Sequence, residues 1–295
     1  QRAAKAAQEG LVKQLFVELK RDFKPSDLPP YTLVKLGMHL ANTSQPEESI
    51  AYFDEILDPS EPNPVRKQAR INGMSKYRKN AVFGKAVALG RSKDNAKVDT
   101  AIKMMRDELS KEESSSNPDR KAMEDAQYNL VKFTAARQDW PAVIAAAEKY
   151  RADKSYKKNL PEVLFLQGQA YLKQNEPDKA LVCFMNITGA DYKGLVKWSA
   201  PAMLAQMDTL WNRNRMSQGT GKQPSDRYVA WRTGSQYVQL LDTPANRKRM
   251  TAEDSDLLNQ VKDKVSRFGS DPAVSQERSD IAAYEAAIRS ARGQK

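Results

Sequence analysis

Residues 161–188 read PEVLFLQGQAYLKQNEPDKALVCFMNIT, and this stretch carries the clearest structural signal of the sequence. In its first half, apolar or small residues recur every three or four positions, the period of one face of an α-helix. These residues are Leu164, Gly168 and Tyr171. Beyond a polar turn at 175–177, the same period returns at Ala180, Phe184 and Ile187. The stretch therefore predicts two helices joined by a short turn.

Gly168 is the most informative residue of this hairpin. A glycine inside a helix costs about 1 kcal/mol relative to alanine, so its presence needs a compensating reason. Because glycine has no side chain, two helix backbones can approach closely at this point, and the rings of Tyr171 and Phe184 fill the wedge beside it. We therefore interpret Gly168 as a packing residue.

The same pattern occurs at Tyr31–Asp58. Pro46 occupies a position where the start of a helix tolerates a missing N–H donor, and Glu47 and Glu48 follow at the positive end of the helix dipole. The inward-facing residues of the first predicted helix are Leu33, Leu36, Gly37 and Leu40, and those of the second are Ser49, Phe53 and Ile56.

Two weaker copies lie between these hairpins. One combines Phe83, Gly84 and Val87 with Ala101, Met105 and Leu109, and we expect its turn to be lengthened by Arg91–Lys97. The other combines Tyr128, Val131 and Thr134 with Val143, Ala147 and Tyr150. Val131 stands where the others have glycine, so the packing there must differ locally. Further helices are expected at Ala3–Phe23, Trp198–Trp211, Asp226–Leu241, Ala252–Phe268 and Pro272–Arg292.

These motifs resemble the tetratricopeptide repeat family. Gly168-x2-Tyr171, Pro177-Asp178-Lys179-Ala180 and Phe184 carry the resemblance most clearly, and the Tyr31–Asp58 copy departs from it by Leu40 for tyrosine and Ser49 for alanine. The resemblance covers roughly residues 31–212. It implies an all-α fold in which paired helices stack into a right-handed superhelical solenoid.

The domain organisation that follows has three parts. Residues 1–30 form an N-terminal helix and linker, residues 31–212 the repeat array, and residues 213–295 a C-terminal helical extension that caps the apolar end of the stack. The N-terminal helix fits equally well as the second half of another repeat.

Composition limits the function classes. Hydrophobic residues make up 40% of the 295 residues and charged residues 29%, which is typical of a folded chain. The formal net charge of +11 favours acidic partners, although a solvated basic surface explains it equally well. No apolar run approaches the ~20 residues of a membrane span.

Residues for catalysis are nearly absent. The single histidine, His39, and the single cysteine, Cys183, are distant in sequence, so they suggest neither a zinc set nor a Cys–His pair. Gly219-Thr220-Gly221-Lys222 is reminiscent of a phosphate loop, but Met216 and Gln223 occupy positions where that motif needs glycine and Ser or Thr. We predict no enzyme activity, no metal and no cofactor.

The family resemblance implies a concave groove lined by the first helix of each pair. The groove-facing positions carried over are Val34, Lys35, Met38, Arg78, Lys85, Tyr128, Asn129, Lys132, Phe165, Gln169 and Lys173. Cations bind carboxylates, aromatic rings and methionine offer apolar anchors, and an asparagine pairs with peptide backbone groups. We therefore expect a protein–protein interaction scaffold or adaptor that binds an acidic peptide segment.

Two other function classes remain open. Ten Lys or Arg between Arg66 and Lys97, and eight between Arg213 and Arg249 interleaved with aromatic residues, are compatible with nucleic-acid or anionic-polymer binding. An enzyme or a sugar-binding protein would need a pocket with converging polar groups. The start at Gln1 suggests a processed mature chain or a piece of a longer protein. With the single cysteine and the basic charge, it favours a bacterial periplasmic, envelope or secreted location over the cytoplasm.

Overall fold

A computed structural model of the chain describes residues 14–43, 45–189, 196–219 and 221–293. All the regular elements in these ranges are helices, as the sequence predicts, and no strand occurs in them. The chain forms two compact units, residues 1–139 and residues 140–295. The boundary lies inside the predicted repeat array, between the two helices expected to form its third pair, and each unit is described below by itself.

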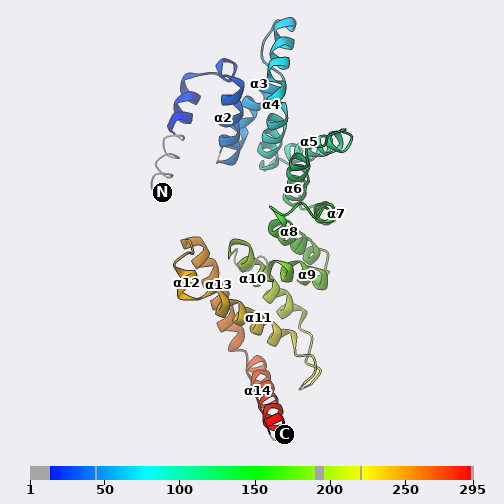
Figure 1. Cartoon of the computed structure of the whole chain (residues 1–295), viewed down its shortest axis with the longest axis vertical. Helices are drawn as coiled ribbons and strands as arrows, with labels where there is room; N and C mark the ends of the chain where they lie inside the picture. The colour runs from blue at the N-terminus through cyan, green and yellow to red at the C-terminus, as the bar shows by residue number, and fades with distance from the viewer. Residues whose placement is uncertain (1–13, 44, 190–195, 220, 294–295) are drawn as a thin grey trace. The chain divides into compact units, whose positions relative to one another are not determined.

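Unit 1 contains a helical segment at 14–22 and six further elements that follow one another closely (Figure 1). They are η1 (Pro25–Asp27), α2 (Pro30–Asn42), α3 (Pro46–Leu57), α4 (Pro64–Gly90), α5 (Asn95–Glu113) and α6 (Arg120–Ala136). The hairpin predicted at 31–58 is confirmed as α2 and α3, which pack on each other and on α4. Residues 3–13 of the predicted N-terminal helix lie outside the described residues.

Local sequence explains where these helices begin. Pro30, Pro46 and Pro64 each occupy the first turn of a helix, where the missing N–H is not needed. The side chains of Asp94 and Asp119 accept hydrogen bonds from backbone N–H groups at the starts of α5 and α6. The helix starts are therefore encoded locally, before tertiary packing is considered.

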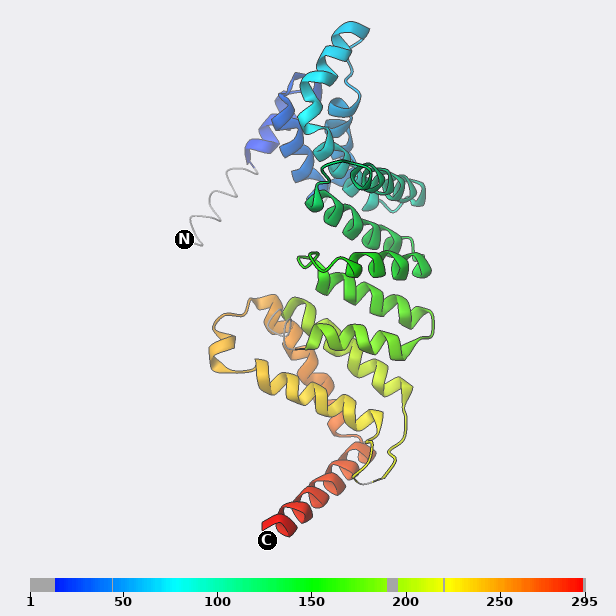
Figure 2. The ribbon, with the colours of Figure 1, turned by 45° about the vertical axis from the view of Figure 1, so that its right-hand side comes forward.

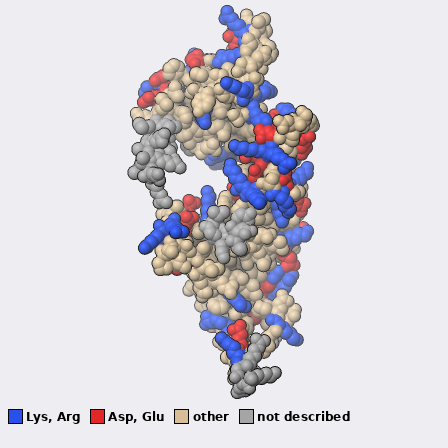
Figure 3. All heavy atoms as spheres, in the orientation of Figure 1, with Lys and Arg blue, Asp and Glu red and all other residues tan. Residues whose placement is uncertain are grey.

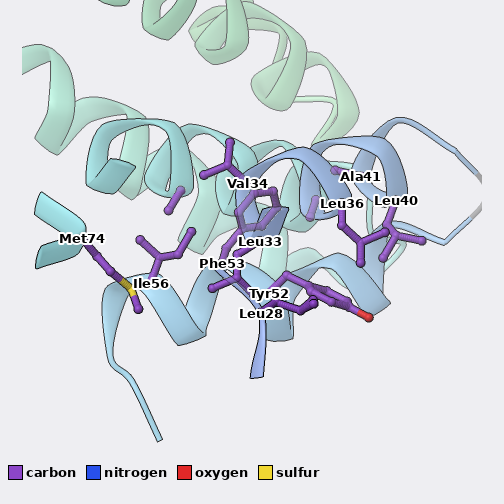
Figure 4. Close-up of a cluster of buried hydrophobic side chains, with 12 residues drawn as sticks. Leu28, Leu33, Val34, Leu36, Leu40, Ala41, Tyr52, Phe53, Ile56 and Met74 are labelled. Carbon is purple, nitrogen blue, oxygen red and sulfur yellow. The ribbon is translucent and has the colours of Figure 1, made fainter. Parts of the chain in front are cut away.

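The core of unit 1 gathers around Phe53, which is fully buried (Figure 4). A Cβ added to Gly37 would lie 2.8 Å from the Phe53 ring, and one added to Gly84 would lie 2.2 Å from it. Two glycines on different helices therefore accommodate one ring, which brings α2, α3 and α4 close together. This confirms the packing role that the sequence predicts for glycine at these positions.

The packing does differ near Val131, as expected. Val131 is fully buried in α6, and the close approach is made instead by Gly90 at the end of α4. A Cβ at Gly90 would lie 2.1 Å from the Phe133 ring. The glycine and the phenylalanine are thus supplied by different positions from those in the hairpins at either side.

The lengthened turn expected at Arg91–Lys97 is shorter than predicted, although it is one residue longer than the turns that follow α2 and α8. Only Arg91–Asp94 separate α4 from α5. Asn95, Ala96 and Lys97 instead form the first turn of α5. The preceding helix, α4, is 27 residues long and begins well before Gly84. Its first turns are largely exposed, with Val65 79% exposed, so this part of α4 extends beyond the packed hairpin.

Unit 2 contains eight helices in its described residues. They are α7 (Trp140–Ala152), α8 (Leu160–Lys173), α9 (Pro177–Thr188), α10 (Val196–Arg213), α11 (Asp226–Leu241), α12 (Pro244–Arg247), α13 (Ala252–Gly269) and α14 (Pro272–Gly293). The predicted helices at 198–211, 226–241, 252–268 and 272–292 are confirmed within one or two residues. Figures 1 and 2 show α8, α9 and α10 side by side, with α9 packed on both neighbours.

The predicted C-terminal cap is only partly formed. Leu258 and Val261 of α13 are buried against α10 and α11, so α13 covers the end of this stack. In contrast, α14 makes few contacts with α11 and α13 and runs away from them in both views (Figures 1 and 2). Only Val274 of α14 belongs to the core among its described side chains.

Candidate partner-binding groove

Close packing of α8 on α9 exposes the opposite face of α8. A Cβ added to Gly168 would lie 2.6 Å from the Phe184 ring, so the two helices meet at this point. Phe184 itself is fully buried. Phe165 packs against the same ring, with 5.9 Å between ring centroids, and remains half-buried. The residues on the next turns of α8 face α10.

A groove with a cavity of about 500 Å³ lies between α8 and α10. Its apolar floor includes Leu172, which is 38% exposed, and the ring of Phe184. The groove is lined by Gln169, Leu172, Asn175, Pro177, Phe184, Ala205, Asp208, Thr209, Asn212 and Arg213. We call this the α8–α10 groove.

Three carboxamide side chains surround its apolar floor. Gln169, Asn175 and Asn212 are exposed, and within the described residues none of them has a side-chain hydrogen bond. Asn175 has a φ of 59°, a left-handed conformation that asparagine tolerates. Each carboxamide both donates and accepts hydrogen bonds. Together these groups complement the alternating N–H and C=O groups of an extended peptide backbone.

The arginine in the groove is held by carboxylates. Arg213 donates to Asp226 at 2.8 Å from Nε and 2.5 Å from Nη2, and it also pairs with Asp178. Burial raises the pKa of Asp226, but the hydrogen bonds from Arg213 and from the backbone N–H of Arg215 outweigh it and hold that pKa below its ordinary value. Asp208 is paired with Lys264 in the same way. These charges therefore stabilise the walls of the groove.

The sequence-predicted residues of α8 fall on or beside this groove. Gln169 lines it, Phe165 packs at the ring beneath it, and Lys173 is exposed one turn further along α8. Within the described residues Lys173 has no ion pair. Sequence reasoning missed Leu172, Asn175 and Asn212. Asn212 could have been predicted, because groove-facing positions were assigned in the first helix of each of four pairs but not in the fifth such helix.

The predicted residues of unit 1 have mixed environments. On α2, Val34 is buried at 8% exposure, whereas Lys35 and Met38 share an exposed face, with the Lys35 ammonium 5.4 Å from the Tyr31 ring centroid. On α4, Arg78 is exposed, but the Lys85 ammonium is held 2.6 Å from a carboxylate oxygen of Asp54.

The predicted residues on α6 are less available than expected. The side chain of Asn129 is buried, and its amide donates to the Asp125 carbonyl at 2.9 Å, so it does not present a free amide to a peptide. Tyr128 is half-buried beneath the ammonium of Lys132, which lies 5.2 Å from the ring centroid, while Lys132 itself is exposed.

Many cations of the first basic cluster are paired with acids outside their own helices. Lys67 pairs with Asp58, Lys79 with Glu112, and Lys97 with Glu47. Hydrogen bonds from Lys97 lower the pKa of Glu47, and those from Lys79 lower the pKa of Glu112. Figure 3 shows acidic side chains interleaved with the basic ones over α5 and α6. These ion pairs leave less positive charge for phosphate groups than the sequence count suggests.

The aromatic residues of the second basic cluster belong mainly to the core. Tyr228 and Tyr237 are 6% and 4% exposed, and the Tyr237 hydroxyl lies 2.7 Å from that of Ser199. Trp231 is half-buried beneath the guanidinium of Arg278, which lies 5.2 Å from the ring centroid. The helical spacing of these rings therefore reflects packing, and they are not arranged as an exposed stacking platform.

The glycine-rich loop at 219–222 connects α10 to α11 and follows no strand. Gly219 and Gly221 have φ values of 106° and 79°, which accounts for glycine at both positions. The loop is followed by Ser225, whose backbone N–H donates to Glu277 of α14 at 2.8 Å. Thr220 lies outside the described residues.

No group of three or more His, Cys, Asp or Glu residues able to hold a metal occurs in the described part of the chain. Cys183 is buried, and burial raises the pKa of its thiol to about 11. No helix in the described ranges is long and apolar enough to cross a membrane. No family model and no curated protein matches this sequence.

Proposed function

We propose that this chain is a non-catalytic interaction scaffold or adaptor, built as a tetratricopeptide-like solenoid, that binds an extended segment of a partner protein. The observation that carries the proposal is the α8–α10 groove, with its apolar floor and its three exposed carboxamides. Sequential packing of paired helices, with glycine facing phenylalanine at Gly37, Gly84 and Gly168, supports the repeat architecture.

The chemistry of the groove favours binding through the peptide main chain. Gln169, Asn175 and Asn212 satisfy backbone donors and acceptors, while Leu172 contacts an apolar side chain of the bound segment. An extended segment has unpaired backbone groups along its whole length, whereas a folded surface has few. The groove therefore suits a strand-like or terminal segment of a partner.

An acidic segment fits the exposed cations best. Lys173 lies beside the groove without an ion pair among the described residues, and its ammonium is free to meet a carboxylate. Arg213 is already neutralised by Asp226 and Asp178, so it adds rigidity to the groove and little net attraction. We expect Lys173 to contribute mainly to the rate of association, which falls with salt.

The test is a pull-down from native lysate with the whole chain as bait, in which each sample is run with and without nuclease treatment. A Leu172→Glu variant places a charge in the groove, and Val182→Glu, at a 56% exposed position of α9 that does not line it, is the matched control. The partner segment is then synthesised, and its affinity for both variants is measured by calorimetry.

We expect Leu172→Glu to weaken binding at least about tenfold, because a buried carboxylate in an interface leaves an uncompensated charge, while Val182→Glu binds like the parent. Equal binding by both variants would exclude the groove. Recovery of only nuclease-sensitive material would instead favour binding of nucleic acid through the basic surface.

A further inference from the structure

A second cavity in unit 2, of about 500 Å³, lies where the end of α7, the loop before α8 and the end of α9 meet. It is separate from the α8–α10 groove and shares none of its lining residues. Its polar lining is formed by Arg151, Asp153, Lys154, Tyr156, Lys157 and Asn186, with Leu160 and Leu164 at its base. We call it the α7–α9 cavity.

Arg151 supplies the central charge of this cavity. The side chain is half-buried, and its Nη1 donates to the Oε1 atom of Gln167 at 2.9 Å. Gln167 is fully buried and uncharged, so it fixes the guanidinium without neutralising it. Within the described residues no carboxylate lies within ion-pair distance of Arg151. A partly desolvated guanidinium without a counter-charge is an unsatisfied arrangement.

Two lysines add to the positive charge at the rim. Lys154 and Lys157 are exposed, and among the described residues neither has an ion pair. The one acid in the lining, Asp153, is engaged locally, because its Oδ1 accepts from the Ser155 hydroxyl at 2.7 Å and from the Ser155 backbone N–H at 2.9 Å. The lining thus carries three cations against one carboxylate.

The loop that holds these lysines is anchored. The ring of Tyr156 is 8% exposed and packs against Tyr150, with 5.3 Å between ring centroids. The backbone N–H of Asn159 donates to the Tyr150 hydroxyl at 3.3 Å, and that of Tyr156 donates to the Asp153 carbonyl at 3.1 Å. The backbone that carries the two lysines is therefore held at the cavity before any ligand arrives, which lowers the entropy cost of binding.

We propose that the α7–α9 cavity binds a compact oxyanion, that is, a phosphate group or a pair of carboxylates. A guanidinium presents planar donors that match two oxygens of such a group, and the ammonium groups of Lys154 and Lys157 provide point charges around it. The Asn186 side chain, which also lines the cavity, adds a neutral donor. This proposal is independent of peptide binding in the α8–α10 groove.

The test uses the whole chain titrated with sodium phosphate and, in a parallel arm, with sodium malonate, by calorimetry at constant ionic strength set with sodium chloride. We expect saturable binding at one site for at least one of these anions. Arg151→Gln keeps a donor for Gln167 but removes the charge, and it should weaken binding about tenfold. Lys157→Gln, at an exposed position where folding is not at risk, should weaken it by a smaller factor.

Lys149→Gln is the matched control, since Lys149 is an exposed cation on the same helix that does not line the cavity. It should bind both anions like the parent. Absence of saturable binding in both arms would overturn the proposal, and so would equal weakening by the Lys149 and Lys157 substitutions, which would indicate general screening of a basic surface. The malonate and phosphate arms together distinguish a carboxylate ligand from a phosphate ligand.

Discussion

Replacing Gly84 by alanine tests the packing that organises unit 1. The new Cβ would lie 2.2 Å from Cζ and 2.3 Å from Cε1 of Phe53. The ring has little room to move away, because it also packs closely against Gly37 of α2, where an added Cβ would lie 2.8 Å from it. The helix must therefore shift or the ring must leave its rotamer.

Gly73 provides an internal control for this substitution. It lies in the same helix, α4, and a Cβ added there meets nothing within 4 Å. Alanine in place of glycine stabilises an exposed helix position by about 0.5–1 kcal/mol, and this gain applies at both sites. Overpacking a core costs about 1–3 kcal/mol. We therefore expect Gly73→Ala to stabilise unit 1, Gly84→Ala to destabilise it, and the two to differ by about 1–3 kcal/mol.

The measurement is native-state hydrogen exchange of amides in α2, α3 and α4, which reports the stability of unit 1 without assuming that the whole chain unfolds in one step. In a double-mutant cycle, Gly84→Ala should cost less stability in a Phe53→Leu background than in the parent, because the two residues are in contact. Equal stabilisation by Gly73→Ala and Gly84→Ala would refute the inferred contact with Phe53.

Two further predictions concern titratable groups of unit 2. The pKa of Asp226 is lowered below 3.8 on folding, so its carboxylate contributes stability that is present above pH 3.8 and lost as the pH falls through the folded pKa. Asp226→Asn should therefore lower the free energy of unfolding at neutral pH, and denaturant titrations at decreasing pH should show this loss becoming smaller. A loss that does not change with pH would contradict the Arg213–Asp226 pairing. Burial raises the pKa of the Cys183 thiol to about 11, which leaves about one molecule in a thousand ionised at pH 8. A disulfide reagent should therefore react with Cys183 slowly in the native protein and quickly in denaturant. Fast reaction of the native protein would show that the α8–α9 interface opens readily.

The helices could be predicted from local sequence because their signals are local. The prolines that begin α3 and α9 and the three-to-four spacing of Leu164, Gly168 and Tyr171 lie within one hairpin each. The local error at Arg91–Lys97 arose because the polar residues that begin α5 resemble a turn. Whether a charged segment continues a helix depends on packing against neighbouring helices, which the sequence does not state.

The candidate sites were less predictable because they depend on contacts between distant residues. Lys85 and Asn129 lie on the helix faces that the sequence assigns to the groove. However, Lys85 is paired with Asp54, and Asn129 is buried and donates its amide to the Asp125 carbonyl. Similarly, Arg151 stands out only when its neighbours in space are known, since the absence of a carboxylate beside it cannot be read from the chain. Residue type and helical phase identified a face, and three-dimensional contacts decided which of its side chains are available.

The position of Phe53 has a practical consequence for dividing the chain. The ring packs closely against Gly37 of its own hairpin and against Gly84 of the helix that follows. A fragment ending after α3 would expose the part of this ring that packs against Gly84, together with other side chains of the same core cluster, such as Ile56. The smallest piece of unit 1 that can be expressed alone therefore includes α4, and shuffling of single hairpins between proteins would have to carry the glycine of the next hairpin with it.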